Sequence, residues 1–133
     1  MTTREILKQA VTAKIAINSA DTDTKNKALA NMADELLAHT DAILEANKQD
    51  VEAAKGKISD VMIDRLMLDA GRIEGMAKGI RELICLEDPA GKVIRTVERP
   101  NGIIIEKTAV PMGVIAIIYE SRPNVTSDAA ALC

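Results

Sequence analysis

The chain has 133 residues, of which 47% are hydrophobic and 28% charged, enough for one ordinary domain with a buried core. Its net charge of -3, with both signs interspersed, lacks the basic footprint of nucleic-acid-binding proteins, and no apolar run is long enough to span a membrane. Its two cysteines lie far apart in apolar contexts, which predicts reduced, packed thiols in a cytoplasmic protein.

The first two thirds of the chain, residues 3–85, have the hydrophobic period of helices. Thr2 and Glu5 predict a capping box at the start of the first helix, and the polar stretch 21–24 predicts its end. Further helix starts are predicted at Thr40, Ser59 and Asp69, and an end near Gly56. We interpret the apolar stripes as core rather than ligand surface, including Leu7, Val11, Ile15, Leu29, Met32, Leu36, Ile73, Ala77 and Ile80.

The period then changes from that of a helix to that of a strand. Lys92–Arg99 alternates, Pro100–Gly102 is a strong turn signal, and alternation resumes from Ile103 to Val110. The pattern predicts a β-hairpin over 92–110. Because an isolated hairpin is marginally stable in water, we expect it to pair with another sheet or a partner chain.

After the hairpin, an apolar run from Val114 to Ile118 predicts a strand buried on both faces of a sheet. It ends in a charged, proline-containing loop, and residues 127–132 read as the first turns of a helix. Such strand-to-helix loops are the usual ligand sites of α/β folds. Since no partner strands follow, we expect the chain to be the front piece of a larger enzyme.

The end of the chain, Tyr119-Glu120-Ser121-Arg122-Pro123-Asn124-Val125-Thr126, resembles the γ-glutamyl phosphate reductases, or glutamate-5-semialdehyde dehydrogenases, of the aldehyde dehydrogenase superfamily. The stretches 111–115 and 128–133 and upstream segments around Met32 and Asn47 agree with this. The resemblance implies an α/β, aldehyde dehydrogenase-like fold. Residues 1–133 would be the amino-terminal part of its nucleotide-binding domain: helices over 3–85, an oligomerisation-type hairpin at 92–110, and the first core strand and loop at 113–126. The catalytic domain would be absent.

The resemblance implies NADPH-dependent reduction of γ-glutamyl phosphate to glutamate 5-semialdehyde and phosphate, a step of proline biosynthesis. It implies a small-molecule substrate, NADP as cofactor and a homo-oligomeric full-length enzyme. The family's nucleophilic cysteine lies far beyond position 133, so Cys85 and Cys133 are expected to be packed thiols. We therefore expect this chain alone to be inactive.

The loop after the apolar run carries the candidate substrate site. By resemblance, Ser121 and Arg122 would bind the substrate, because a guanidinium suits its phosphate and carboxylate groups. The alternative for Arg122 is an ion pair with Glu120 or Asp128.

Asn124 is the candidate catalytic residue, near where the superfamily places an oxyanion-binding amide. The alternative is that Asn124 or Thr126 is the N-cap of the following helix. By analogy, the backbone of Ile118, Tyr119 and Glu120 would run past the nicotinamide side of the cofactor.

His39 is expected to lie at a helix C-terminus rather than to bind a ligand, and no residues have metal-site spacing. Two other functions stay open. One is a non-catalytic helical or assembly module from a truncated gene. The other is a different acylating aldehyde dehydrogenase, which the Ser121-Arg122-Pro123 string disfavours.

Overall fold

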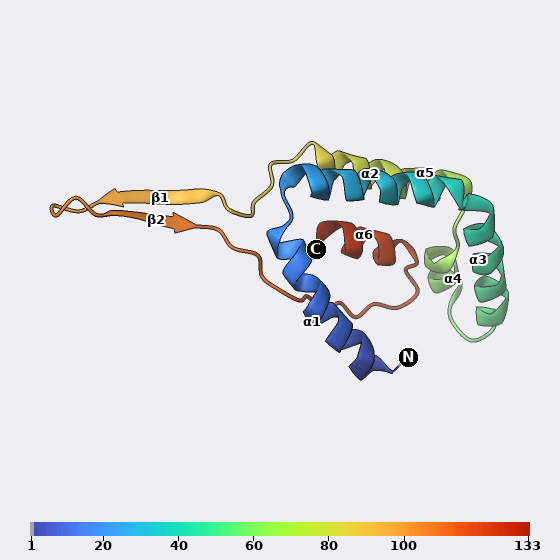
Figure 1. Ribbon diagram of the computed structural model, residues 1–133. Helices are drawn as coiled ribbons and strands as arrows, with labels where there is room; N and C mark the ends of the chain where they lie inside the picture. The colour runs from blue at the N-terminus through green and yellow to red at the C-terminus, as the bar shows by residue number, and fades with distance from the viewer. Residues whose placement is uncertain (1) are drawn as a thin grey trace. The chain divides into compact units, whose positions relative to one another are not determined.

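A computed structural model describes residues 2–133 (Figure 1). The chain divides into two compact units, one combining the residues up to Thr22 with Leu86–Ile115, the other combining Asp23–Cys85 with Ala116–Cys133. The elements of this region are α1 (Thr3–Ser19), α2 (Thr22–Ala38), α3 (Thr40–Ala54), α4 (Asp60–Leu66), α5 (Ala70–Ile84), β1 (Val93–Glu98), β2 (Ile104–Thr108) and α6 (Asn124–Leu132).

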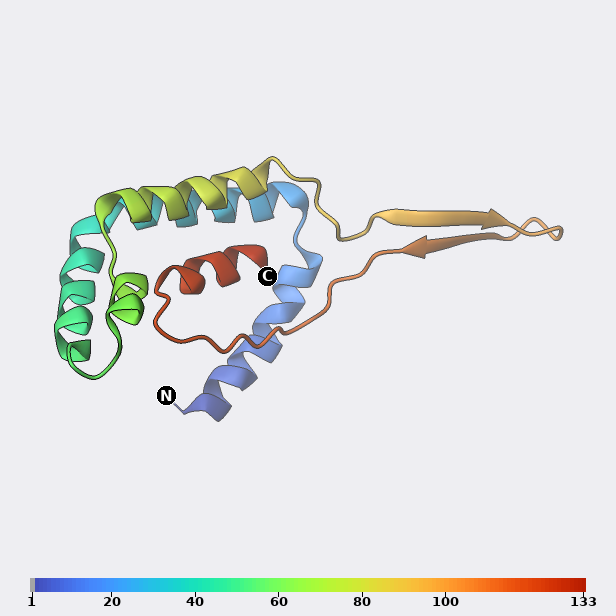
Figure 2. The same ribbon diagram turned by 180° about the vertical axis from the view of Figure 1, so that it is seen from behind.

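The second unit has a small aliphatic core, where α2, α5 and α6 lie side by side (Figure 1 and Figure 2). Ala33 of α2 and Ala77 and Ile80 of α5 are almost wholly buried, and so is Ile73. At the surface, Arg81 Nη2 lies 2.6 Å from Asp34 Oδ1 and ties α5 to α2. The helical stripes predicted for α2 and α5 are confirmed as its core. Partly buried side chains complete it: Leu29, Met32, Leu36, Leu37 and Ala131.

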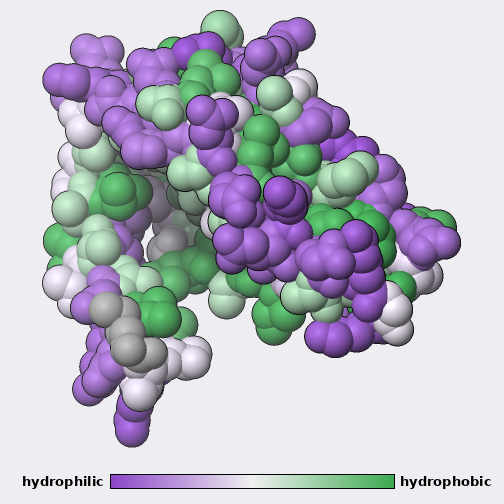
Figure 3. All heavy atoms as spheres, turned by 90° about the vertical axis from the view of Figure 1, so that its right-hand side faces the viewer, coloured by the Kyte–Doolittle hydropathy of each residue, from purple (hydrophilic) through white to green (hydrophobic). Residues whose placement is uncertain are grey.

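On the side of the molecule that carries α3 and α4, hydrophobic side chains reach the surface between charged ones (Figure 3). Val61 and Met67 are 64% and 43% exposed. Exposed apolar side chains scattered in this way are common on folded proteins and do not by themselves indicate a site.

Helix α1, in the first unit, begins as predicted. The Thr2 hydroxyl accepts a hydrogen bond from the Glu5 amide, and the Glu5 carboxylate accepts one from the Thr2 amide. Its predicted role in the core is wrong, because no residue of α1 is buried and its stripe is at least half exposed. A stripe becomes core only where another element covers it, and within this unit none does.

The helix starts at Ser59 and Asp69 are confirmed, and the Asp69 carboxylate accepts a hydrogen bond from the Arg72 amide at 2.7 Å. The start at Thr40 is one residue off, since His39 is the N-cap of α3. The Thr40 hydroxyl instead donates to the Leu37 carbonyl at 2.9 Å. Because α2 and α3 are joined by a single residue, Thr40 lies within reach of the unpaired carbonyls that end α2.

The predicted hairpin is confirmed in the first unit, with β1 and β2 antiparallel and Val97 opposite Ile105. Its turn is closed by a hydrogen bond from the Gly102 amide to the Arg99 carbonyl at 2.9 Å. Gly102 has φ +83°, the left-handed conformation that glycine supplies in such three-residue loops. Residues of both strands are largely exposed, and no third strand pairs with them within residues 2–133.

The predicted buried strand at Val114–Ile118 is not present in the structure. The segment belongs to no sheet of the described chain, and Val114, Ile115 and Ile117 are more than 40% exposed. The physical reason is that a strand is stabilised by hydrogen bonds to a neighbouring strand, and β1 and β2 bond only to each other. The apolar sequence of Val114–Ile118 therefore indicates where a strand could form, but a strand also needs a neighbouring strand to bond to.

Candidate functional site

The predicted site lies in the segment that leads from Ile118 into helix α6, within the second unit. Helix α6 begins at Asn124, three residues earlier than expected, and follows Pro123 in helical conformation. Proline suits this position because its fixed φ is preset for a helix and it has no amide hydrogen to leave unpaired. The segment before it therefore ends at the amino end of a helix, where backbone N–H groups favour negatively charged ligands.

Ser121 is the one residue other than glycine with positive φ in the described chain, at +51°. The left-handed region costs a side-chain-bearing residue roughly 1–2 kcal/mol, and such strain is concentrated at functional loops. This left-handed residue directly precedes Arg122. Nothing in the sequence predicted it, because serine is compatible with many loop conformations.

Arg122 is exposed, and it forms no ion pair or side-chain hydrogen bond among the interactions found in residues 2–133. The predicted alternative, an ion pair with Glu120 or Asp128, is therefore wrong. Asp128 is instead occupied by Asn124, whose Nδ2 donates to the Asp128 carboxylate at 2.9 Å. The Asp128 carboxylate therefore bonds to Asn124, which lies one helical turn away, and not to the Arg122 guanidinium.

Asn124 is the first residue of α6 and not its N-cap, and no side chain caps this helix. Its side chain points along the helix to Asp128, and the Ser127 hydroxyl donates to its backbone carbonyl at 2.9 Å. Thr126 is not the cap either. The N-cap alternative is thus wrong for both residues, and Asn124 retains an amide that only one partner engages.

Tyr119 and Thr126 close the loop between them. Their hydroxyl oxygens lie 2.6 Å apart, a hydrogen bond that joins the start of the loop to the first turn of α6. Sequence reasoning had not paired these residues. Ile118, by contrast, is 99% exposed, and Glu120 is also exposed, so the predicted cofactor-binding residues form an open, partly apolar surface.

The two cysteines are not packed, contrary to expectation, since both are free and exposed. Helix α5 ends at Ile84, so Cys85 lies just past the apolar stripe on which it was placed, and Cys133 follows the end of α6. His39 lies at the end of α2 as predicted, and pairs with Glu35 at 3.1 Å. Within residues 2–133, no group of three or more histidine, cysteine or acidic side chains could hold a metal ion.

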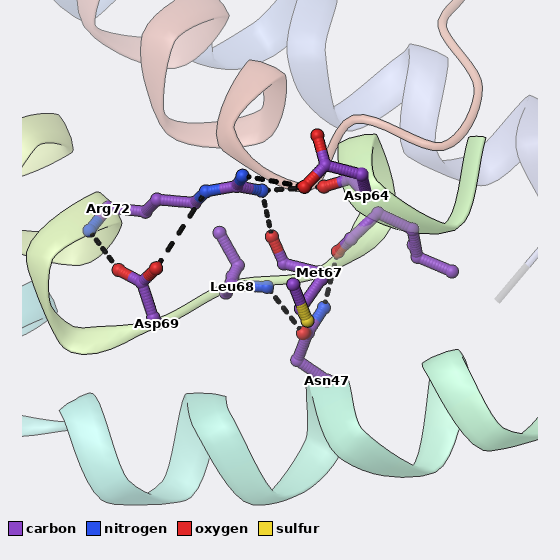
Figure 4. A network of polar contacts seen from close by, with 7 residues as sticks. Asn47, Asp64, Met67, Leu68, Asp69 and Arg72 are labelled. Atoms are coloured by element: carbon purple, nitrogen blue, oxygen red, sulfur yellow. Dashed lines mark hydrogen bonds and ion pairs between the residues drawn. The ribbon is translucent and has the colours of Figure 1, made fainter. Parts of the chain in front are cut away.

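Sequence reasoning missed a polar network built around Asn47 (Figure 4). Asn47 is only 6% exposed; its Nδ2 donates to the Leu66 carbonyl at 2.8 Å, and its Oδ1 accepts from the Leu68 amide at 2.7 Å. One contact is to the last residue of α4 and the other is to the segment that joins α4 to α5. The signal was an amide on the apolar stripe of α3, since a polar residue in such a position must find partners when buried.

Arg72 completes the network from helix α5 (Figure 4). Its guanidinium donates to the Asp64 and Met67 carbonyls, both at 2.6 Å, and pairs with the Asp64 carboxylate at 3.1 Å. These contacts satisfy carbonyls at the end of α4, where the helix leaves them unpaired. The network is structural, and it fixes the turn that positions α5 beside α3.

An open hollow lies along α1, lined by residues of that helix alone. It contains none of the predicted site residues and is lined by one face of a single helix, so it is not a candidate site. None of the helices in residues 2–133 is long and apolar enough to cross a bilayer.

Helices packed on one another, a hairpin, and an apolar segment leading into a strained loop and a helix are the amino-terminal portion of an aldehyde dehydrogenase-like fold. Among the solved structures that share it are two with a TM-score of 0.91. One is the γ-glutamyl phosphate reductase of Thermotoga maritima, which is 41% identical to this chain. The match covers 94% of this chain and 30% of the Thermotoga maritima chain. The other is the γ-glutamyl phosphate reductase of Saccharomyces cerevisiae, which is 33% identical to this chain. The match covers 99% of this chain and 34% of the Saccharomyces cerevisiae chain.

Curated relatives agree with the structures. The γ-glutamyl phosphate reductases of several Streptococcus pneumoniae strains are 60% identical over 129 residues, which is 97% of this chain and 31% of theirs. No family model matches the chain. The predicted resemblance to the γ-glutamyl phosphate reductases is confirmed, and the chain spans 31% of the length of the curated relatives it matches.

Proposed function

We propose that this chain supplies part of an NADP-dependent γ-glutamyl phosphate reductase, which converts γ-glutamyl phosphate to glutamate 5-semialdehyde and phosphate in proline biosynthesis. The observation that carries the proposal is 60% identity over 97% of the chain to reductases of that name. The agreement of two solved reductases in fold supports it. Free cysteines without a disulfide accord with a cytoplasmic enzyme.

In the proposed reaction a cysteine thiolate attacks the acyl carbon and phosphate leaves, giving a thioester. Neither cysteine of this chain is placed for that role, because Cys85 follows the end of α5 and Cys133 the end of α6, outside the segment 118–124 that carries the other proposed site residues. The nucleophile therefore comes from outside the part of the enzyme that this chain represents. The contribution of this chain is to bind and orient.

Arg122 and Ser121 would bind the anionic substrate. Arg122 is exposed and makes no ion pair in residues 2–133, so its donors remain available to a phosphate or carboxylate. The left-handed backbone at Ser121 sets the direction in which the loop presents it. Asn124 would donate its amide N–H to the oxyanion that forms on the acyl carbon.

The surface formed by Ile118, Tyr119 and Glu120 is suited to the nicotinamide end of NADP, which supplies a hydride when bound. A flat heteroaromatic ring is matched by an exposed aliphatic side chain and a half-exposed phenol ring. The backbone of residues 118–120 also makes no hydrogen bond in the described chain, so its amide groups are available to the ring's carboxamide.

The hairpin would serve assembly into a homo-oligomer. Its outer edges and its isoleucines are uncovered in residues 2–133, with Ile103 and Ile105 55% and 47% exposed. An exposed strand edge is a template for pairing with another strand. We therefore expect it to pair in the full-length enzyme, within a subunit or between subunits.

A chimera tests the function directly. This chain replaces the 129 matching residues of the Streptococcus pneumoniae reductase, whose remaining length supplies the rest of the enzyme. The assay is the reverse reaction, phosphate-dependent oxidation of glutamate 5-semialdehyde with NADP. We expect activity in the chimera, and none in this chain alone or in the remaining part of the reductase alone. An inactive but folded chimera would refute the function and favour the non-catalytic module.

A further inference from the structure

The amide of Asn124 is held from one side only. Its Nδ2 donates to Asp128 Oδ2 at 2.9 Å, one helical turn along α6, and both side chains are half-buried. Among the contacts found in residues 2–133, the second Nδ2 hydrogen and Oδ1 have no partner. One Nδ2 hydrogen is therefore engaged by Asp128, and the second hydrogen on the same nitrogen is available to an acceptor on a ligand.

The chemistry of the partner decides which way the amide faces. An ionised carboxylate only accepts hydrogen bonds, so it must meet the NH₂ group and not the carbonyl oxygen of the asparagine. Turning the amide over would place two oxygens against each other. A neutral amide or hydroxyl at position 128 would impose no such restriction, because either of those groups can donate or accept.

We propose that Asp128 is a positioning residue for the reaction: it fixes the flip state of the Asn124 amide, so that a donor rather than an acceptor is presented to the substrate oxyanion. The inference rests on the proposed function and on the proposed role of Asn124. Asp128 itself acts only through Asn124.

A simpler role must be distinguished, since an asparagine and an aspartate four residues apart also stabilise a helix. Asp128→Asn separates the two roles. The variant has the same size and can still hydrogen-bond to Asn124, so it retains the helix contact. It loses the acceptor-only character that fixes the amide. Asp60→Asn is the matched control, because Asp60 is an exposed acidic residue in the first turn of α4.

The experiment uses the chimera with the reductase of Streptococcus pneumoniae. We expect Asp128→Asn to lower kcat by about tenfold or more, a part of the roughly 10²–10³-fold loss that removal of an oxyanion donor causes. The KM for NADP and the thermal midpoint should stay near those of the parent, and Asp60→Asn should match the parent throughout. Asn124→Ala combined with Asp128→Asn should be no slower than Asn124→Ala alone.

Three results would overturn the proposal. An unchanged kcat in Asp128→Asn would show that only the helix contact matters. Losses that multiply in the double variant would show that Asp128 acts independently of Asn124. The third concerns the contact itself, in a ¹⁵N-edited spectrum of the 133-residue chain. If Asp128→Asn leaves the signals of the Asn124 side-chain amide unshifted, the contact is not formed. An inactive parent chimera would remove the proposed function, and this role with it.

Discussion

Replacement of Asn47 by alanine should destabilise the second unit, because this side chain hydrogen-bonds to the backbone where α4 ends and the chain continues to α5. Two hydrogen bonds are lost, to the Leu66 carbonyl and from the Leu68 amide, each worth about 1 kcal/mol. Both backbone groups are half-buried, so leaving them unpaired adds roughly 1 kcal/mol. Alanine returns roughly 0.5 kcal/mol through its better helix propensity. The net expected loss is about 2.5 kcal/mol.

The matched control is Asn31→Ala in α2, where the asparagine is exposed and makes no side-chain hydrogen bond found in the described chain. Asn31→Ala gains the same helix propensity as Asn47→Ala but loses no hydrogen bond. Urea unfolding of the 133-residue chain, followed by far-UV circular dichroism, gives the two free energies of unfolding.

Native-state hydrogen exchange provides a second, local measurement. The Leu68 amide should exchange faster in Asn47→Ala than in the parent, because its acceptor is gone. A variant that is unfolded without urea would agree with the expected loss. Equal urea midpoints for Asn47→Ala and Asn31→Ala, together with unchanged exchange at Leu68, would refute the reasoning.

Three further outcomes are expected. In the chimera, Arg122→Lys should weaken use of the anionic substrate about tenfold with little change in the KM for NADP, because a bidentate contact becomes a point charge; a lowered thermal midpoint with unchanged kinetics would indicate a structural role. Ile103→Lys with Ile105→Lys should shift the chimera to a smaller assembly in sedimentation velocity, and an unchanged mass would place the hairpin's partner within its own subunit. Cys85 and Cys133 should both react rapidly with a thiol reagent in the native 133-residue chain, and their replacement by serine should leave the activity of the chimera intact; slow labelling would contradict their exposure.

The local structure of this chain follows closely from its sequence. The capping box of Thr2 and Glu5, the helix start at Asp69 and the turn at Gly102 are each set by residues within a few positions of one another. Such contacts have the same geometry wherever the segment lies in the fold. The resemblance carried by residues 119–126 was also sufficient to identify the related reductases.

The candidate site was located by sequence, but its internal contacts were not. The loop predicted at 120–124 does lead into a helix, although no strand precedes it and Asn124 is already the first residue of α6. Sequence could not assign Asp128 to Asn124 rather than Arg122, nor pair Tyr119 with Thr126. These choices depend on where α6 begins and on the backbone of one serine, both of which are settled by competition among several nearby donors and acceptors.

Burial was decided by tertiary structure alone. The stripes of α1 and α5 are both apolar at helical spacing, yet Ile73 and Ile80 are buried while Leu7 and Ile15 are exposed. An apolar run likewise predicted a strand at 114–118, and no strand forms without a neighbour to accept its hydrogen bonds. The hydrophobic pattern of a sequence indicates which face of a helix or strand is apolar. Whether that face is covered depends on another element, and its position is not encoded in the local sequence.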